Sequence, residues 1–148
     1  VYEHQRATTS DKRVFLLTRS SFLGQQRYAS HSWSGDVVST WEVMKKQLAA
    51  GLNYSLCGIP YWNTDLGGFF ARKYNNNVHN IAYHELHVRW YQWGAFQPIM
   101  RSHNSSPVAV EIYQFGKKGD WAYDALEKYT HLRYRLLPYL YSTSFSIH

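Results

Sequence analysis

The sequence contains a single cysteine, Cys57, among its 148 residues. One cysteine excludes an internal disulfide and any zinc site built from several cysteines. Cys57 stands in the apolar run from Leu56 to Ile59. We therefore expect it to be buried as a small hydrophobic side chain.

Long apolar stretches and phosphate-binding turns are also missing. No run approaches the roughly 18 apolar residues of a membrane-spanning helix, and residues 1–4 do not resemble a signal peptide. Gly67-Gly68 is followed by Phe69-Phe70, which lacks the spacing of a dinucleotide fingerprint or a P-loop. We expect no membrane span and no cofactor.

Charged residues make up only 18% of the chain, and the net charge of +6 is not concentrated in one segment. Basic residues occur singly or in short pairs such as Lys45-Lys46 and Lys117-Lys118. A nucleic-acid-binding surface needs clustered basic residues, so we expect no nucleic-acid partner.

Aromatic residues are abundant, with 13 Tyr and 6 Trp. This composition is the reverse of the low-hydrophobicity, high-charge signature of disordered chains. It fits either a large core or a carbohydrate cleft.

Four short apolar runs, each bounded by glycine, proline or polar residues, predict buried strands at residues 14–18, about 29–34, 54–59 and 97–100. Three segments with helical periodicity cover about 39–53, 80–96 and 120–141. Ser39 and Glu42 form a capping-box pair at the start of the first, and Gly51 marks its end. Pro138 should bend or end the last helix.

Strands that alternate with helices predict an α/β fold with a parallel sheet, either doubly wound or part of a (β/α)8 barrel. Polar residues directly follow the strand-like runs at Arg19, Asp36, Asp65 and residues 101–103. Barrel enzymes place their chemistry at this carboxyl-terminal edge. A complete barrel takes about 250 residues, so the chain accounts for roughly half of one.

Two segments set an acid among aromatics and glycines. They are Trp33-Ser34-Gly35-Asp36 and the stretch from Gly58 to Phe69 that contains Asp65. An aromatic ring offers a flat apolar face to the C–H side of a pyranose, and a carboxyl group can bind sugar hydroxyls or protonate a glycosidic oxygen.

Together with Leu17-Thr18-Arg19-Ser20 and Met100-Arg101-Ser102-His103-Asn104, these segments resemble glycoside hydrolase family 31, which includes α-glucosidases and α-xylosidases. The resemblance covers residues 14–141. It implies a partial TIM barrel of about the last four β/α units, with residues 1–148 as a fragment of a single glycosidase catalytic domain.

The resemblance implies that Asp36 is the general acid/base of a retaining α-glycosidase. It assigns Asp65 to the wall of the subsite for the terminal sugar, and His103 to its hydroxyls. Arg19 would orient the acid and bind sugar oxygens, and Arg101 would steady a carboxylate.

Simpler explanations exist for each of these side chains. Asp36 could begin a helix, Asp65 could cap the Gly67-Gly68 turn, and an arginine or histidine after a strand is often an ordinary surface residue.

Among the aromatics, Trp33, Trp62 and Phe69 are candidate sugar platforms, of which Trp62 and Phe69 flank Asp65. His84 and His87 are spaced three residues apart, which does not match the His-Glu-x-x-His zinc helix. We expect no metal site.

The family's nucleophile is an aspartate in a segment that would lie upstream of this chain, and Glu3 and Asp11 do not match its surroundings. The chain also begins without Met and stops inside a helical pattern, so we expect a piece of a longer protein. Its partners would be an oligosaccharide substrate and the missing N-terminal half of the barrel.

Other functions remain open at this point. The chain could be a non-catalytic half-barrel that binds sugar or forms a homo-oligomer, and the same residues would serve a transglycosylase or an α-glucan lyase of the family. A bacterial source is suggested, with the location open between the cytoplasm and the periplasm or exterior.

Overall fold

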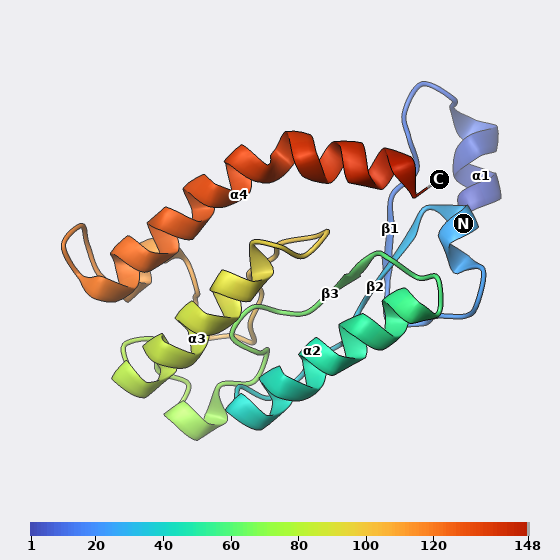
Figure 1. The fold of residues 1–148 in the computed structure, drawn as a ribbon. Coiled ribbons are helices and arrows are strands. Elements are labelled where there is room, and N and C mark those ends of the chain that lie inside the picture. Colours follow the sequence, from blue (N-terminus) through green and yellow to red (C-terminus); the bar gives the residue numbers. More distant parts are fainter. Residues whose placement is uncertain (148) are drawn as a thin grey trace.

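A computed structural model describes residues 1–147 and shows a small parallel sheet with helices beside it (Figure 1). The strands are β1 (Leu16–Thr18), β2 (Ser30–Trp33) and β3 (Trp62–Asn63), in the spatial order β1-β2-β3. Both pairings are parallel, with Leu17 opposite His31 and Ser32 opposite Trp62. The predicted parallel sheet is therefore confirmed.

The helices are α1 (Tyr2–Thr8), α2 (Trp41–Leu56), α3 (Ile81–Gly94) and α4 (Trp121–Ser146), with short 3-10 turns η1 (Gln25–Tyr28), η2 (Arg72–Tyr74) and η3 (Ile112–Phe115). α2 connects β2 to β3, which gives a βαβ unit. Its N-cap is Thr40, whose hydroxyl accepts a hydrogen bond from Val43 N at 3.2 Å. The capping pair expected at Ser39 is wrong by one residue.

The strand expected at residues 54–59 is wrong. α2 continues past Gly51 to Leu56, and the chain turns at Gly58, where φ is +74°, before β3 begins at Trp62. Leu52 and Leu56 are four residues apart and lie on the outside of α2, where they are exposed. Cys57 is exposed as well, because it caps this helix end and is not part of a buried strand.

Residues 97–100 also do not form a strand. Arg133 of α4 donates to the backbone oxygens of Gln97 and Pro98 in this segment and of Ala95 just before it. Pro98 has no N–H to contribute to a ladder. A side chain of α4 therefore holds this segment in place of a neighbouring strand.

α4 continues through Pro138 to Ser146, and Figure 1 shows it as a curved helix that runs beside α3. A proline removes one intrahelical hydrogen bond and crowds the preceding turn, which is sufficient to bend a helix without ending it. Pro138 therefore does not end α4, which continues beyond it to Ser146.

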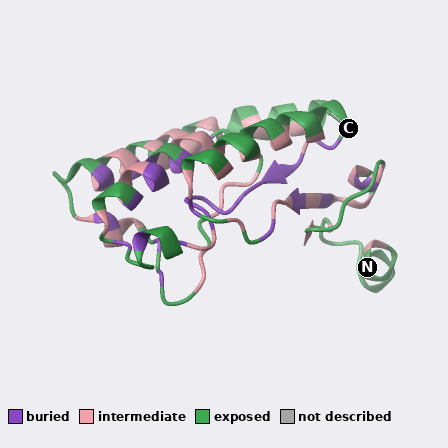
Figure 2. Ribbon diagram, turned by 90° about the horizontal axis from the view of Figure 1, so that it is seen from below, coloured by how far each residue is buried: buried purple, intermediate pink, exposed green. Residues whose placement is uncertain are grey.

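The core lies between α3, α4 and the loops at the carboxyl ends of the strands (Figure 2). α3 contributes most of it, including the fully buried Tyr83, Leu86 and Trp90. Buried polar side chains also line the sheet, since Ser32, Asn63 and Thr64 have no exposed surface. The buried side chains of α3, which include Tyr83 and His87, thus form a layer beneath the loops that follow the strands, and this layer is called the floor below.

His87 is the most unusual member of this floor. Its ring is fully buried and stacks on Phe115 with the ring centroids 4.4 Å apart. Neither ring nitrogen has a hydrogen-bond partner among residues 1–147. Burial therefore lowers the pKa of His87 to about 3, with a smaller contribution from His84.

We predict that acid destabilises the fold through His87. The unfolded imidazole titrates near pH 6.5 and the folded one near 3, so its contribution to stability is complete above pH 6.5 and is lost as the pH falls toward 3. The loss per pH unit is at most about 1.4 kcal/mol. His87→Leu should flatten the fall in the free energy of unfolding between pH 6.5 and pH 4.

Denaturant unfolding of the complete gene product at several pH values measures this slope. His131→Leu is the control, because His131 is exposed on α4. An unchanged slope in His87→Leu would contradict the prediction.

Candidate active site

Two charged side chains meet where β1 and β2 end. Arg19 follows β1 directly, and Asp36 lies three residues beyond β2. Because these strands are parallel neighbours, their carboxyl ends bring the two side chains together, and Arg19 Nη2 donates to Asp36 Oδ1. The side chains are 56% and 31% exposed, respectively. The Asp36 carboxylate is therefore accessible from solvent.

Gly35 allows this approach. It has φ +76°, in the left-handed region that favours glycine, and a Cβ there would lie 3.3 Å from Arg19 Nε. The turn after β2 thus requires a glycine both for its backbone and for the space next to the guanidinium group.

A second ion pair joins the loop after β3 to the segment after α3. Arg101 Nη2 donates to Asp65 Oδ1, and the Asp65 side chain is completely buried. Burial raises the pKa of Asp65, and the positive charges of Arg101 and His103 oppose this shift. Asp36 raises the pKa further and Arg19 lowers it. All four of these charged side chains are thus close enough to Asp65 to act on it.

Aromatic rings complete the group. The guanidinium carbons of Arg19 and Arg101 lie 5.3 and 5.5 Å from the centroid of the Trp33 ring, within cation–π range. The Phe69 ring lies 5.2 Å from the His103 ring. The structure therefore brings together seven of the eight predicted site residues: Arg19, Trp33, Asp36, Asp65, Phe69, Arg101 and His103.

Trp62 is the exception. Its ring is buried against α2, with the Tyr54 ring centroid 4.5 Å away and Gly51 in direct contact. Successive side chains of a strand point to opposite faces, and Trp62 lies on the face that α2 covers. It belongs to the sheet–helix packing and not to this group.

The loop of residues 64–70 is held on both sides. Phe69 N donates to Val37 O at 2.7 Å in the loop after β2, and Ser105 N donates to Phe69 O at 3.0 Å. Ser34 Oγ also donates to Thr64 Oγ1 at 3.1 Å. The loops that carry Asp36, Asp65 and His103 therefore form one hydrogen-bonded unit.

Gly67 and Gly68 fit this loop to the floor beneath it. Their φ angles are +83° and +81°, and a Cβ on Gly68 would lie 2.8 Å from Ser39 Cα. A Cβ on Gly67 would collide with the His87 ring and lie 3.0 Å from the Tyr83 hydroxyl. Any other residue at either position would push the Asp65 loop away from its supports.

Residues 1–147 contain no group of three or more histidine, cysteine or acidic side chains arranged to hold a metal ion. The side chains of His84 and His87 lie in different surroundings, because His87 packs in the core and His84 lines a surface hollow. No helix in this range is long and apolar enough to cross a membrane.

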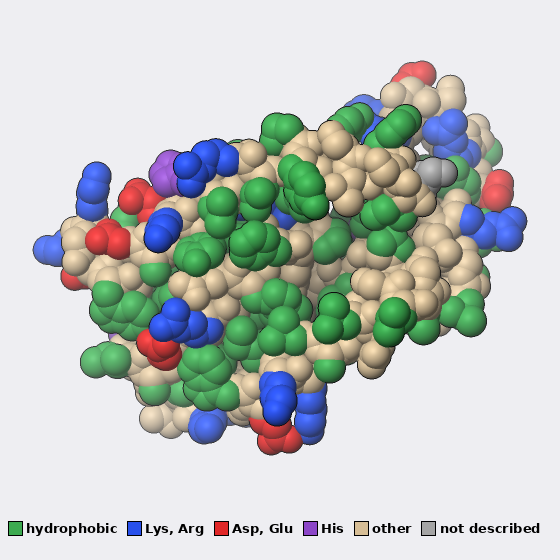
Figure 3. Space-filling model, viewed as in Figure 1, with side chains coloured by type: hydrophobic (Ala, Val, Ile, Leu, Met, Phe, Trp, Pro, Cys, Tyr) green, Lys and Arg blue, Asp and Glu red, His purple; other side chains and the backbone are tan. Residues whose placement is uncertain are grey.

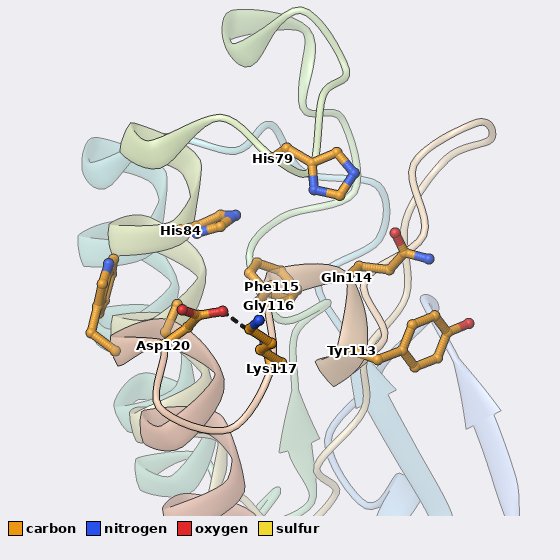
Figure 4. A pocket seen from close by; sticks show the side chains of 10 residues that line it. His79, His84, Tyr113, Gln114, Phe115, Gly116, Lys117 and Asp120 are labelled. Atoms are coloured by element: carbon orange, nitrogen blue, oxygen red, sulfur yellow. Dashed lines mark hydrogen bonds between the residues drawn. The ribbon is translucent and has the colours of Figure 1, made fainter.

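The hollow next to His84 has a volume of about 460 Å³ (Figure 4). His79, in the turn before α3, and His84, in the first turns of α3, line it. Asp120, the N-cap of α4, lines it too and accepts a hydrogen bond from Lys117 N at 2.9 Å. Tyr113 and Gln114 of η3 line it as well. The hollow shares no residue with the charged group described above.

The sequence patterns did not reveal how the group is supported. Asn104 stands next to His103 in the sequence and looks like part of a polar loop, and Tyr83 looks like one more apolar position of a helix. In the structure they contact each other at 3.0 Å beneath the Asp65 loop. The one signal in the sequence was the adjacency of Asn104 to a candidate site residue.

One protein-family model covers almost the whole chain. Residues 1–143 match the model of the glycosyl hydrolases family 31 TIM-barrel domain. The chain belongs to glycosyl hydrolase family 31. The resemblance inferred from the motifs is therefore confirmed, and the three parallel strands are part of the family's barrel.

Individual relatives of this family 31 chain include α-xylosidases and an α-glucosidase. An α-xylosidase of Saccharolobus solfataricus is 49% identical over 142 residues, which are 96% of this chain and 18% of the relative. The mouse lysosomal α-glucosidase is 41% identical over 135 residues, which are 90% of this chain and 13% of the mouse protein.

Among solved structures, the family 31 α-xylosidase of Xanthomonas citri superimposes with a TM-score of 0.86 at 43% identity, covering 95% of this chain and 16% of that one. The family 31 chain thus spans less than a fifth of the length of these relatives.

We predict that the two ion pairs differ in their contribution to stability. Arg101→Met leaves the buried Asp65 carboxylate without its partner and should cost about 3 kcal/mol at pH 7. Arg19→Met breaks the exposed pair and should cost less than about 1 kcal/mol. Lowering the pH should reduce the Arg101→Met penalty, because protonation of Asp65 removes the buried charge.

Denaturant unfolding of the complete gene product at pH 7 and pH 5 measures both differences. Equal losses in the two variants, or a penalty for Arg101→Met that does not shrink at pH 5, would contradict this account.

Proposed function

We propose that this chain is part of a retaining α-glycosidase that removes terminal α-glucosyl or α-xylosyl residues from oligosaccharides, with Asp36 as the general acid/base. The observation that carries the proposal is the accessible Asp36 carboxylate beside the buried Asp65–Arg101 pair at the carboxyl ends of parallel strands. Barrel enzymes use this edge for catalysis.

Asp36 fits the role of proton donor by its position. It is partly open to solvent, so it can exchange protons with water, and its contact with Arg19 fixes the direction of the carboxyl group. In a retaining mechanism it would protonate the leaving oxygen and then take a proton from the attacking water.

Asp65 fits a binding role better than a nucleophilic one. It is enclosed and held by Arg101, so one of its oxygens is already engaged. Oδ2 has no hydrogen-bond partner among the described residues and is buried, so accepting a sugar hydroxyl would require the side chains that cover it to move aside. Arg101, His103, Trp33 and Phe69 would form the surrounding wall of the subsite.

The covalent step would use a carboxylate from outside residues 1–148. One carboxyl group can protonate a leaving group, but the oxocarbenium-like centre needs a second group to capture it. Residues 1–148 would then be about the last four β/α units of the barrel, with the segment around residues 97–103 in the place of the last strand.

The uncovered apolar surface supports a larger barrel. Figure 3 shows hydrophobic side chains spread over the face that carries α3 and α4, and Tyr134, Tyr139 and Phe145 of α4 are all more than 60% exposed. β1 and β3 both have an open edge within the described residues. The rest of the barrel would cover these surfaces.

We predict that Asp36→Asn lowers kcat/KM of the complete gene product by about 10²- to 10⁴-fold on p-nitrophenyl α-xyloside or α-glucoside, the range typical of a lost general acid/base. The loss should be larger on a disaccharide, because its leaving group needs protonation more than p-nitrophenolate does. Steady-state kinetics on both substrates measure this difference.

Asp11→Asn is the control, because Asp11 is an exposed acid remote from the group. An Asp36→Asn enzyme with the wild-type rate, or with equal losses on both leaving groups, would refute the assignment of Asp36. NMR detection of the product anomer tests retention separately.

A further inference from the structure

We propose that Tyr83 and Asn104 are positioning residues that fix the loops carrying Asp36, Asp65 and His103 relative to one another. The inference rests on the proposed function for its catalytic consequence. It concerns a helix residue and a loop amide that do not themselves line the group of charged and aromatic side chains.

The Asn104 amide bridges two parts of the structure. Its Nδ2 donates to Gly68 O at 2.8 Å and to the Tyr83 hydroxyl at 3.0 Å. The Gly68 carbonyl can only accept, so the nitrogen of the amide must face it. Asn104 therefore ties the Asp65 loop and its own segment, which carries His103, to α3.

Tyr83 provides the fixed end of this bridge. It is fully buried, and its ring packs against Tyr74 and Phe115 with centroids 5.3 and 6.3 Å apart. Burial raises the pKa of Tyr83 to about 12, while the hydrogen bond from the Asn104 amide acts in the opposite direction. The hydroxyl is therefore a neutral group at a defined position on the floor of the site.

Ser39 brings in the third loop. It lies three residues after Asp36, and its backbone N donates to Phe70 O at 2.9 Å. Phe69 N also donates to Val37 O at 2.7 Å, so the Asp36 loop is bonded directly to the Asp65 loop, which Asn104 ties to the Tyr83 hydroxyl. A buried hydrogen-bond node of this kind aligns catalytic groups without touching the substrate.

The opposing view is that these bonds only stabilise the fold. The chain offers a matched control, because Tyr91 is also buried on α3 and its hydroxyl bonds Thr130 Oγ1 on α4 at 2.8 Å. Tyr91→Phe and Tyr83→Phe each remove one buried hydroxyl and keep the ring. The Tyr83 hydroxyl bonds Asn104 in a site loop, whereas the Tyr91 hydroxyl bonds a side chain of α4.

The test compares these variants in the complete gene product, with kinetics expressed per titrated active site. Tyr83→Phe should lower kcat/KM about 5- to 10-fold, the size expected for one lost hydrogen bond, with a lower kcat and a higher KM. Tyr91→Phe should change neither. Tyr83→Phe combined with Asn104→Ala should be no worse than Asn104→Ala alone, because the two residues act through one contact.

Hydrogen exchange supplies a readout that does not need activity. Tyr83→Phe should speed exchange at the amides of Phe69 and Ser105, in the two loops that the bridge joins, and Tyr91→Phe should not. If the wild-type enzyme is inactive on α-xylosides and α-glucosides, the proposed function is refuted. The hydrogen-exchange rates of Phe69 and Ser105 then still test whether Tyr83 and Asn104 hold the loops together.

The inference is overturned if Tyr83→Phe and Tyr91→Phe lower the unfolding temperature alike and leave kcat/KM and loop exchange unchanged. It is also overturned if the effects of Tyr83→Phe and Asn104→Ala simply add.

Discussion

The buried ion pair between Asp65 and Arg101 is the constraint on which the arrangement of this site depends. A carboxylate with no exposed surface is tolerated only with a charged partner, so the loop after β3 and the segment after α3 must stay together. Burial raises the pKa of Asp65, and Arg101 and His103 oppose that rise. Arg101 therefore favours the charged form of the Asp65 carboxyl group as well as holding it in place. Asp36 and Arg19 lie at the exposed margin of this group.

The buried residues of α3 beneath the loops determine where the Asp65–Arg101 pair lies. α3 presents Tyr83 and His87 directly to Gly67, and a side chain on that glycine would collide with the His87 ring. The floor is apolar enough to keep His87 neutral and the Tyr83 hydroxyl protonated, since burial moves the pKa of each toward its uncharged form. Rigid support from a helix thus places groups that are carried on loops, where such groups are usually mobile.

Much of the fold and of the site follows from the sequence. The strands near Leu17 and His31 and the acids after β2 and β3 were predictable, because short apolar runs that end in polar residues mark the carboxyl edge of a parallel sheet. The strand expected at residues 54–59 failed because an apolar run can also be the end of a helix, and periodicity over six residues does not separate the two. The segment at residues 97–100 failed because Arg133, far away in the sequence, takes up its carbonyls.

Side-chain direction was harder to predict than position. Trp62 and Asp65 are three residues apart, yet one packs on α2 and the other enters the charged group. The role of Asn104 depends on a contact with a residue 21 positions away, which no local pattern encodes.

A crystal structure of the complete gene product with a bound α-xylosyl or α-glucosyl ligand tests the central claim most directly. The account predicts that the terminal sugar contacts Asp65 and His103 while the Asp36 carboxyl faces the glycosidic oxygen. A sugar bound elsewhere, with the Asp65–Arg101 pair untouched and Asp36 pointing away from the ligand, would contradict it.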